Sequence, residues 1–455
     1  MSRDTSRVSA LNERARTQDG RYVLYFMQHS QRAAHNPALE HAISVANDCG
    51  LPLLTVFAVD PDYPEANARH YTFMLEGIKE TAAAITKRGA HFSLRKGTPP
   101  DIAAALAKDA AAVVTDRGYL RHLVAWREAL AEDAPCAVEM VEGDVIVPVA
   151  VASPKKETAA RTIRPKLKRA LGDWLALPDR IPLKAKARGL ASADDRDLSD
   201  LAAFVAGLGC DASVGPAPGF RGGTGEARAR LKRFVDQRLK GYGSDRADMV
   251  NRHVSELSPY LHFGQISPLE VYHAVKDAKP PQDAEDSFID EMLTRRELAV
   301  NFVHNEPNYD KYSALPEWAR NTLADHADDP RDRVYTTQEM EDGKTDDPYW
   351  NAAMKEMRVT GYLHNHMRMY WGKRIIAYTN TPEHAFRTAL SLNNKYLLDG
   401  RDANSYANVA WLFGIHDRGW PERAVFGKVR TMMPSGLKRK FDIEAYVRWA
   451  RDLRS

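Results

Sequence analysis

Short apolar runs alternate with amphipathic stretches through the first third of the chain. The runs are rich in β-branched and aromatic residues, which predicts strands at Tyr22–Phe26, Leu51–Val59, His91–Leu94, Ala111–Asp116 and Ala137–Val141. The stretches between them repeat apolar residues at helical spacing, which predicts helices at Pro37–Cys49, Arg69–Arg88, Asp101–Lys108 and Leu120–Glu132. This alternation predicts a parallel sheet with helices on both faces, a Rossmann-like α/β domain over residues 21–150.

The pattern changes twice after residue 150. Residues 151–225 lose the periodicity and become rich in Gly and Pro toward their end, which predicts a long interdomain linker. Helical periodicity dominates residues 226–455, so we expect an all-helical C-terminal domain. Its predicted helices are Ala227–Lys240, Pro268–Asp277, Asp286–His304, Asp347–Thr360, Tyr362–Ala377, Pro382–Leu392 and Ile443–Leu453.

Composition places the chain among globular proteins. Of its 455 residues, 44% are hydrophobic and 27% are charged, which excludes a disordered chain. No apolar run approaches the roughly 20 residues that cross a bilayer, and Met1–Gly20 has no apolar secretory segment. We therefore expect no membrane partner and a cytoplasmic location, associated with the nucleoid in a bacterium. The three cysteines lie too far apart for a CxxC site, and we predict no metal.

Charge is balanced in total but uneven along the chain. The sequence has 64 Lys and Arg against 61 Asp and Glu, a net charge of +3. Lys155–Arg169 and Arg423–Arg454 are nevertheless strongly basic, whereas Asp325–Asp332 is acidic. Because a DNA-binding surface needs only one basic face, this distribution keeps nucleic acid among the partners.

Two polar stretches carry candidate chemistry, each with an ordinary alternative. The hydroxyls and amides of Asn251–Gly264 could bind a phosphate or form a capped turn. Further on, Glu291 and Arg295 are spaced i,i+4 and could form a surface ion pair. Glu291 could instead face a cleft and bind or protonate a substrate carbonyl. Spacing alone favours the surface ion pair.

Aromatic residues gather toward the C-terminus. Five of the eight tryptophans stand at or after Trp350, where they could fill the core, stack on bases or carry electrons. Arg368 shares a predicted helix with Trp371 and could pair with Asp399 or Asp402 in the loop Leu398–Asn404. A loop held by a salt bridge explains that pairing equally well.

Several ordered strings resemble the class II cyclobutane pyrimidine dimer (CPD) photolyases of the photolyase/cryptochrome family. They are LSPYLHFGQIS (Leu257–Ser267), RELAVNF (Arg296–Phe302), MRMYW (Met367–Trp371), LNNKYLLDGRD (Leu392–Asp402), GWPERAVFG (Gly419–Gly427) and KRKFD (Lys438–Asp442). Weaker matches include MQHSQR (Met27–Arg32) and AARTIRPK (Ala159–Lys166). The resemblance extends over most of the chain from about Arg21.

The resemblance implies an N-terminal α/β domain, a linker and a helical domain that holds FAD. By motif, Tyr242 and the loop residues Val254, Ser255, Leu257 and Ser258 are expected to hold the flavin phosphates. Arg368 and Asp399 would pair beside the isoalloxazine ring, and Asn393 would lie near flavin N5. Asp402 would contact polar groups of the flavin.

The implied reaction is light-driven repair of UV-damaged DNA, in which excited FADH⁻ lends an electron to a pyrimidine dimer. Glu291 would bind the dimer carbonyls, while Arg246, Met369 and Trp411 would line the pocket for the flipped-out lesion. Trp371 and Trp350 would carry electrons to resting flavin, with Tyr335 or Tyr378 as further members. Arg295, Lys438, Arg439 and Lys440 would contact DNA. We expect a monomer.

The sequence also departs from the family pattern. Ala247 replaces an expected Asn, and Ala403-Asn404-Ser405 replaces a Pro-Asn-Gly turn. Arg295 stands where some relatives have Trp, and Tyr378 stands where a further Trp is often found. The N-terminal MQHSQR string leaves an antenna chromophore and its identity open. The alternatives are a cryptochrome-like flavin photoreceptor and a light-independent nucleotide-binding protein.

Overall fold

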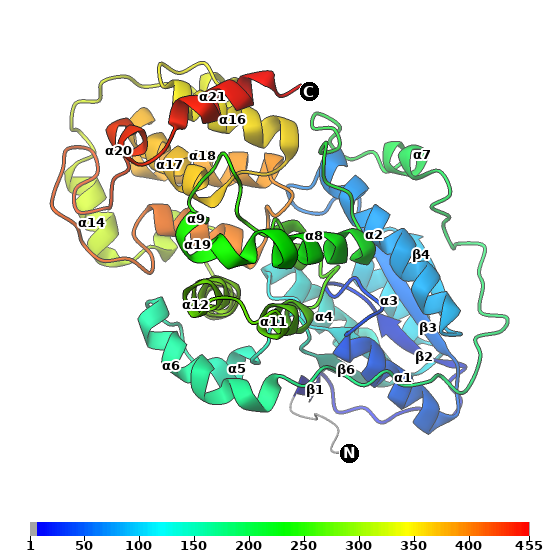
Figure 1. The fold of residues 1–455 in the computed structure, drawn as a ribbon. Helices are drawn as coiled ribbons and strands as arrows, with labels where there is room; N and C mark the ends of the chain where they lie inside the picture. Colours follow the sequence, from blue (N-terminus) through cyan, green and yellow to red (C-terminus); the bar gives the residue numbers. More distant parts are fainter. Residues whose placement is uncertain (1–6, 455) are drawn as a thin grey trace.

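A six-stranded sheet forms the base of the N-terminal half (Figure 1). The computed structural model describes residues 7–454. The strand order is β1-β6-β5-β2-β3-β4, with bounds Val8–Ala10 (β1), Tyr22–Phe26 (β2), Leu53–Val59 (β3), His91–Lys96 (β4), Ala110–Asp116 (β5) and Ala137–Val141 (β6). Neighbours from β2 to β6 are parallel, whereas β1 pairs antiparallel with β6. The expected parallel α/β sheet is confirmed, with one antiparallel strand added at its edge.

The two faces of the sheet are covered by different helices. Val23 and Tyr25 of β2 pack with α1 (Pro37–Cys49) and α2 (Ala68–Lys87), whereas Tyr22, Leu24 and Phe26 pack with α3 (Pro99–Ala107) and α4 (Arg121–Asp133). Successive side chains of a strand point to opposite faces, so a strand buried on both sides reads as an unbroken apolar run.

Residues 149–206 contain short helices that the sequence did not predict. They are α5 (Val149–Ala152), α6 (Ala160–Ala170) with a 3₁₀ turn at Leu171–Trp174, and α7 (Leu201–Ala206). The rest runs in extended form along the N-terminal half, where the Arg196 amide donates to the carbonyl of Leu94 in β4 at 2.8 Å (Figure 1). The weak periodicity of this segment did not reveal its helices, above all α6, whose basic surface obscures its narrow apolar stripe.

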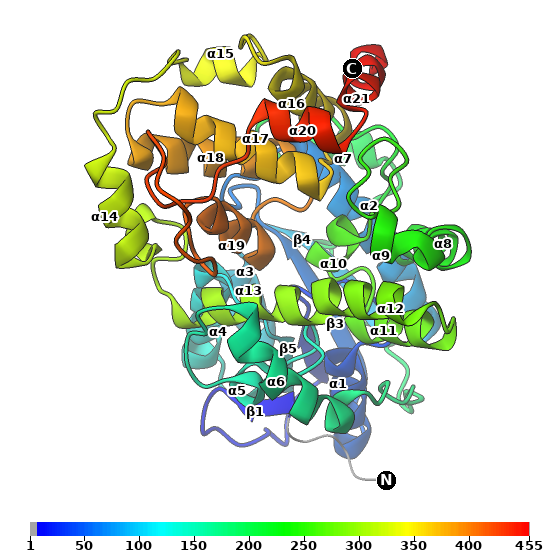
Figure 2. The same cartoon turned by 60° about the vertical axis from the view of Figure 1, so that its left-hand side comes forward.

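Helices make up the second half of the chain (Figure 2). They are α8 (Thr224–Gln237), α9 (Tyr242–Asp245), α10 (Ser258–His262), α11 (Pro268–Asp277), α12 (Gln282–Ile289), a π-helical turn (Asp290–Arg295), α13 (Arg296–Asn305), α14 (Glu317–Asp325), α15 (Thr337–Glu341), α16 (Pro348–Thr360), α17 (Asn365–Tyr378), α18 (Pro382–Tyr396), α19 (Ala403–Leu412), α20 (Pro434–Lys440) and α21 (Ile443–Asp452). Two 3₁₀ turns lie at Leu239–Gly241 and Tyr312–Ala314. Among residues 7–454, no helix is long and apolar enough to cross a membrane.

The predicted helix Asp286–His304 proves to be three segments. It consists of the end of α12, the π-helical turn and α13. A π-helical turn adds a residue to the helical repeat and so changes which side chains share a face. The helical periodicity of the sequence could not reveal this change.

Buried polar contacts join α13 to the N-terminal half. The carboxylate of Glu297 accepts from the amide of Ile146 at 2.6 Å, and the guanidinium of Arg296 donates to Asp144 at 2.7 Å. All three side chains, those of Glu297, Arg296 and Asp144, are buried. Burial raises the pKa of Glu297 to about 8, against the opposing effects of its amide donors and of Arg296.

Candidate functional site

A cavity of about 730 Å³ opens within the helical half. Its wall is built from α9, the loop before α10, the π-helical turn, α17, α18 and α19. The predicted residues on this wall are Tyr242, Arg246, Val254, Ser255, Leu257, Ser258, Glu291, Arg295, Arg368, Met369, Trp371, Asn393 and Trp411. A side chamber of about 230 Å³ adds Asp399 and Asp402. The volume lies within the range of cofactor sites.

A buried ion pair spans the wall between α17 and the loop after α18. Arg368 donates to both oxygens of Asp399, at 2.9 and 3.1 Å, and both side chains are nearly buried. Of the two partners that the sequence allowed for Arg368, the structure selects Asp399. The Nε of Arg368 is buried and has no hydrogen-bond partner within the described chain, so a polar group in the cavity would satisfy it.

Asn393 is fixed in place at the same wall. It is 1% exposed, and its amide nitrogen donates to Asn394 and to the hydroxyl of Ser405, both at 3.1 Å. Because these contacts determine which end of the amide is the nitrogen, its oxygen is the end left for a ligand.

Trp371 forms the apolar part of the wall, and Trp350 lies behind it. The two rings stack with centroids 6.3 Å apart, and the indole of Trp350 donates to the backbone carbonyl of Trp371 at 2.8 Å. The indole N–H of Trp371 is buried with no partner among residues 7–454. Two residues that line the cavity, Arg368 and Trp371, therefore each have a buried donor without a partner in the described chain.

The loop before α10 is held by a carboxylate. Glu256, in a left-handed conformation with φ of 56°, is paired with Arg230 at 3.1 Å and with Arg238 at 3.5 Å. These contacts place Ser255 and Ser258 on the cavity wall. Nearby, burial raises the pKa of Tyr242 to about 12, so its hydroxyl keeps its proton at neutral pH.

Asp402 begins α19 and occupies the side chamber. One oxygen accepts from the Asn404 amide at 2.8 Å, and the other lies 3.0 Å from His262 Nδ1. Burial alone would raise the pKa of Asp402, but the hydrogen bond and charge of His262 outweigh burial and lower it. Asp402 is therefore ionised at neutral pH.

Glu291 pairs with Arg246 and not with Arg295. Glu291 Oε1 lies 2.6 Å from Arg246 NH1, across the cavity mouth, whereas Arg295 lies 3.5 Å from Asp290. The sequence expectation of an i,i+4 ion pair is wrong because these residues lie in the π-helical turn. Both partners of the observed pair are more than a third exposed, so a substrate can reach them.

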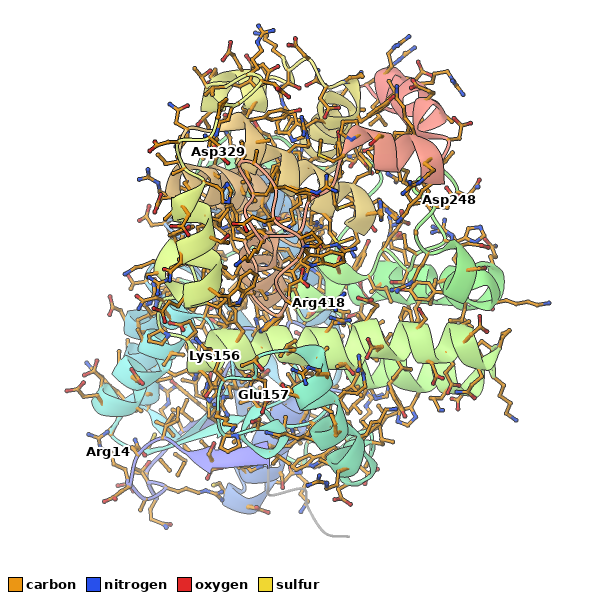
Figure 3. All side chains as sticks on the ribbon, turned by 90° about the vertical axis from the view of Figure 1, so that its left-hand side faces the viewer. Arg14, Lys156, Glu157, Asp248, Asp329 and Arg418 are labelled. Atoms are coloured by element: carbon orange, nitrogen blue, oxygen red, sulfur yellow. The ribbon has the colours of Figure 1, made fainter. Side chains whose placement is uncertain are left out.

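The remaining predicted residues lie at the mouth or beyond it. Trp411 and Met369 line the cavity, and Lys373, which is fully buried, places its ammonium 5.0 Å from the Trp411 ring. Lys438, Arg439 and Lys440 are exposed on α20 and do not line either chamber. Figure 3 shows Arg418, on the loop after α19, on the same side of the molecule as Lys156 of the basic tract Lys155–Arg169.

Some residues of the cavity wall were not predicted from the sequence. Asn404 and Asn408 line both chambers from α19, and His364 and His366 line the main one. The spacing of Asn404 and Asn408 placed them on one helical face, but α19 itself was not predicted.

A smaller cavity of about 70 Å³ lies at the carboxyl ends of β2 and β3. Its wall includes Gln28, Tyr63, Trp126 and Arg401. Polar atoms of Gln28 and Arg401 are buried there without partners in the described chain.

Two family models match the chain. The model described as DNA photolyase matches residues 23–185, and the model described as FAD binding domain of DNA photolyase matches residues 288–454. A deoxyribodipyrimidine photo-lyase of Methanothermobacter thermautotrophicus is 43% identical, over 98% of this chain and 98% of its own. One from Potorous tridactylus is 37% identical, over 97% of this chain and 84% of its own.

Solved structures share the fold at lower identity. The bacterial class III photolyase of Agrobacterium tumefaciens superposes with a TM-score of 0.72 at 21% identity, covering 94% of this chain and 86% of its own. An archaeal photolyase of Sulfolobus tokodaii, solved with two FAD molecules, gives 0.69 at 18%, covering 93% and 88%. These likenesses establish the architecture of both halves.

Proposed function

The chain belongs to the photolyase/cryptochrome family, and on that premise we propose that it is a light-dependent lyase that splits cyclobutane pyrimidine dimers in UV-damaged DNA. One observation carries the proposal. The cavity places the Arg368–Asp399 pair, Asn393 and Trp371 on its inner wall and the Glu291–Arg246 pair at its mouth. One chamber thus offers an inner site for a cofactor and an outer site for the two linked bases of the lesion.

The inner wall fits FAD. The buried, unpaired donors of Arg368 and Trp371 suit the polar edge of a flavin, and the Arg368–Asp399 pair would flank its ring. The carbonyl of Asn393 would accept a flavin N–H, and Tyr242, Val254, Ser255, Leu257 and Ser258 would surround the phosphates. Asp402 would reach the flavin through the side chamber. When bound, FADH⁻ supplies light absorption and the electron that opens the cyclobutane ring.

The outer wall fits a dimer taken out of the duplex. Trp411 and Met369 offer apolar surface for the extruded bases, and enzymes that act on bases in DNA remove them from the stack. Glu291 would give up its contact with Arg246 and, as the protonated acid, donate a hydrogen bond to a dimer carbonyl, stabilising the negative charge that develops there. Arg246 would then be free to contact the backbone of the DNA.

The basic residues at the rim would position the duplex. Arg295 lies at the mouth, and Lys438, Arg439 and Lys440 are exposed on α20. Contacts of Lys and Arg with phosphates supply affinity without reading sequence, which suits recognition of damage in any sequence. We propose this rim as the DNA-binding face.

Within the family, we place the chain in class II. The ordered strings from Leu257 to Asp442 support this assignment. On this assignment we propose that the protein splits CPDs and leaves 6–4 photoproducts intact.

The proposed function is tested by illuminating the reduced protein with blue light in the presence of either of two defined oligonucleotides. One strand carries a thymine CPD and the other a 6–4 photoproduct, and repair is followed by chromatography in light and in darkness. We expect loss of the CPD in light only. A flavin-containing protein that leaves both lesions intact would favour the cryptochrome-like photoreceptor, and a colourless protein would exclude both.

Glu291→Ala extends that test to the outer wall. The variant should keep its flavin and lower the CPD repaired per absorbed photon several-fold, because the dimer carbonyls lose their partner. Glu317→Ala, at an exposed position on α14, is the matched control and should repair normally. Equal yields for the two variants would assign Glu291 to the surface alone.

An antenna chromophore in the smaller cavity stays a prediction. The volume of about 70 Å³ is below the roughly 300 Å³ typical of ligand sites, so a bound chromophore would have to displace side chains. An absorption band of the purified protein beyond those of flavin would support it.

A further inference from the structure

A path of four aromatic rings leads outward from the cavity wall. It starts at Trp371 and passes to Trp350, stacked at 6.3 Å, and then to Tyr378, whose ring meets Trp350 edge-on at 6.0 Å. Tyr335 follows, with its ring 5.1 Å from that of Tyr378. The first two members are indoles and the last two are phenols. A phenol differs from an indole because its one-electron oxidation at neutral pH releases the hydroxyl proton.

The hydroxyl of Tyr378 is hydrogen-bonded to a carboxylate that can accept this proton. It donates to Asp347 Oδ2 at 3.1 Å. The same oxygen accepts from the hydroxyl of Tyr370 and lies 3.4 Å from Arg374 Nε. Arg374 also donates to the Tyr378 hydroxyl oxygen at 3.2 Å. Asp347 is 7% exposed, so the phenol and its acceptor form a nearly closed unit.

The other carboxylate oxygen of Asp347 accepts hydrogen bonds from backbone amides. Oδ1 accepts from the amides of Tyr349 and Trp350 at 3.0 and 3.1 Å and so caps α16. A proton on Oδ2 would leave these contacts in place. One carboxylate can therefore gain and lose a proton without freeing the helix that carries Trp350.

Tyr335 lacks such an acceptor. Its hydroxyl oxygen accepts from the Asp346 amide at 2.9 Å, and no carboxylate accepts from it among the described contacts. Tyr370 has the carboxylate but is not in ring contact with Trp350 among the described aromatic pairs. Tyr378 alone among these phenols combines ring contact with the path and a carboxylate at its hydroxyl.

We propose that Tyr378 is the terminal electron donor of the path and that Asp347 accepts its proton. The proposal rests on the proposed function, whose light-excited oxidised flavin serves as the oxidant. Once Trp371 has lost an electron and regained one from Trp350, Trp350 is a radical cation. Tyr378 gives one electron to Trp350, and its phenolic proton moves to Asp347 Oδ2. The products are neutral Trp350, a neutral tyrosyl radical and a carboxylic acid.

This arrangement favours electron transfer from Tyr378 to Trp350 over recombination, in which the electron returns to Tyr378. Burial, and next the charge of Asp347, raise the pKa of Tyr378, so the hydroxyl is protonated before oxidation. Return of the electron to Tyr378 requires the proton to return as well, which slows recombination. Because the acceptor is built into the fold, the transfer needs no bulk base.

Flash excitation of the oxidised holoprotein tests the proposal through radical spectra. We expect a tryptophan radical that converts into a tyrosyl radical, seen by transient absorption and by electron paramagnetic resonance with deuterated tyrosine. The conversion should slow in D₂O. Tyr378→Phe should abolish the tyrosyl signal and keep the tryptophan signal. Tyr370→Phe is the matched control, because it also removes a hydroxyl from Asp347, and it should retain the tyrosyl signal.

Asp347→Asn isolates the proton acceptor. Asparagine is also a good N-cap, so α16 should persist while the tyrosyl signal is lost. Should that variant fail to fold, Tyr378→Trp supplies the second test, with expected loss of both the tyrosyl signal and the sensitivity of the donor step to D₂O. A tyrosyl signal that survives Tyr378→Phe, or disappears in Tyr370→Phe, would overturn the proposal. Absence of bound flavin would instead contradict the proposed function.

Discussion

At the scale of single residues, the buried ion pair of Arg368 and Asp399 stabilises the cavity wall, and its contribution can be measured by substitution. Arg368→Ala would leave the Asp399 carboxylate, which is 8% exposed, without its cation. Breaking a buried pair by removing one partner costs about 3–5 kcal/mol, and this site should come near the lower end because it borders a cavity. Urea unfolding of the flavin-free protein measures the loss.

The double variant Arg368→Ala/Asp399→Asn controls for charge. It removes the uncompensated carboxylate and should recover part of the lost free energy of unfolding, while both variants retain less FAD than the parent. Equal urea midpoints for the single and double variants would mean that Asp399 does not depend on Arg368.

Contacts between individual side chains were also the features least predictable from the sequence. The Arg368–Asp399 pair was within reach because the sequence offered Arg368 only two acidic candidates in one loop. The pairs Glu291–Arg246 and Tyr378–Asp347 join residues 45 and 31 positions apart with no shared motif. Only the way in which separate helical segments pack brings those groups together.

At the scale of elements, the turn between α16 and α17 controls how the two tryptophans meet. Gly361 ends α16 with φ of 68°, and a Cβ there would lie 3.0 Å from Ala217 Cβ and 3.1 Å from Leu398 Cγ. Gly361→Ala should therefore lower the free energy of unfolding by more than the roughly 1–2 kcal/mol of the left-handed conformation. Urea unfolding measures it.

Gly50 provides the control for that prediction. It ends α1 with the same φ of 68°, and a Cβ there would meet nothing within 4 Å. Gly50→Ala should show the conformational effect alone. If both variants lose the same stability, the contacts around Gly361 adapt to the methyl group.

Periodicity explains which elements the sequence predicted and which it did not. β2 to β6 and α1 to α4 carry strong local patterns, and their predicted positions agree with the structure to within a few residues. β1 has three residues and exists only through its pairing with β6. The π-helical turn changes register inside an apparently regular helix, and α19 was hidden by its weak amphipathic pattern.

At the scale of the whole molecule, Glu297 couples the association of the two halves to pH. Its pKa is about 8 in the folded protein against an ordinary value of 4.5, so between these values the folded state binds more protons than the unfolded state. The contribution of Glu297 to stability is therefore complete below about pH 4.5 and is lost as pH rises through 8.

Glu297→Gln removes this dependence. Its amide oxygen can still accept from Ile146, so the variant should become more stable relative to the parent as the pH of urea unfolding rises from 5 to 8. Glu132→Gln, at an exposed position on α4, is the control and should follow the parent. Parallel profiles for Glu297→Gln and the parent would contradict the assignment.

The three residues of β1 protect the sheet from edge-to-edge aggregation with other copies of the protein. Both rims of the sheet would otherwise present unpaired backbone groups, which invite strand-to-strand aggregation. β1 covers the rim at β6, and Arg196 of the extended segment reaches the rim at β4. A chain truncated to begin at residue 21, where the sequence pattern placed the start of the domain, would expose β6 and should precipitate more readily during refolding.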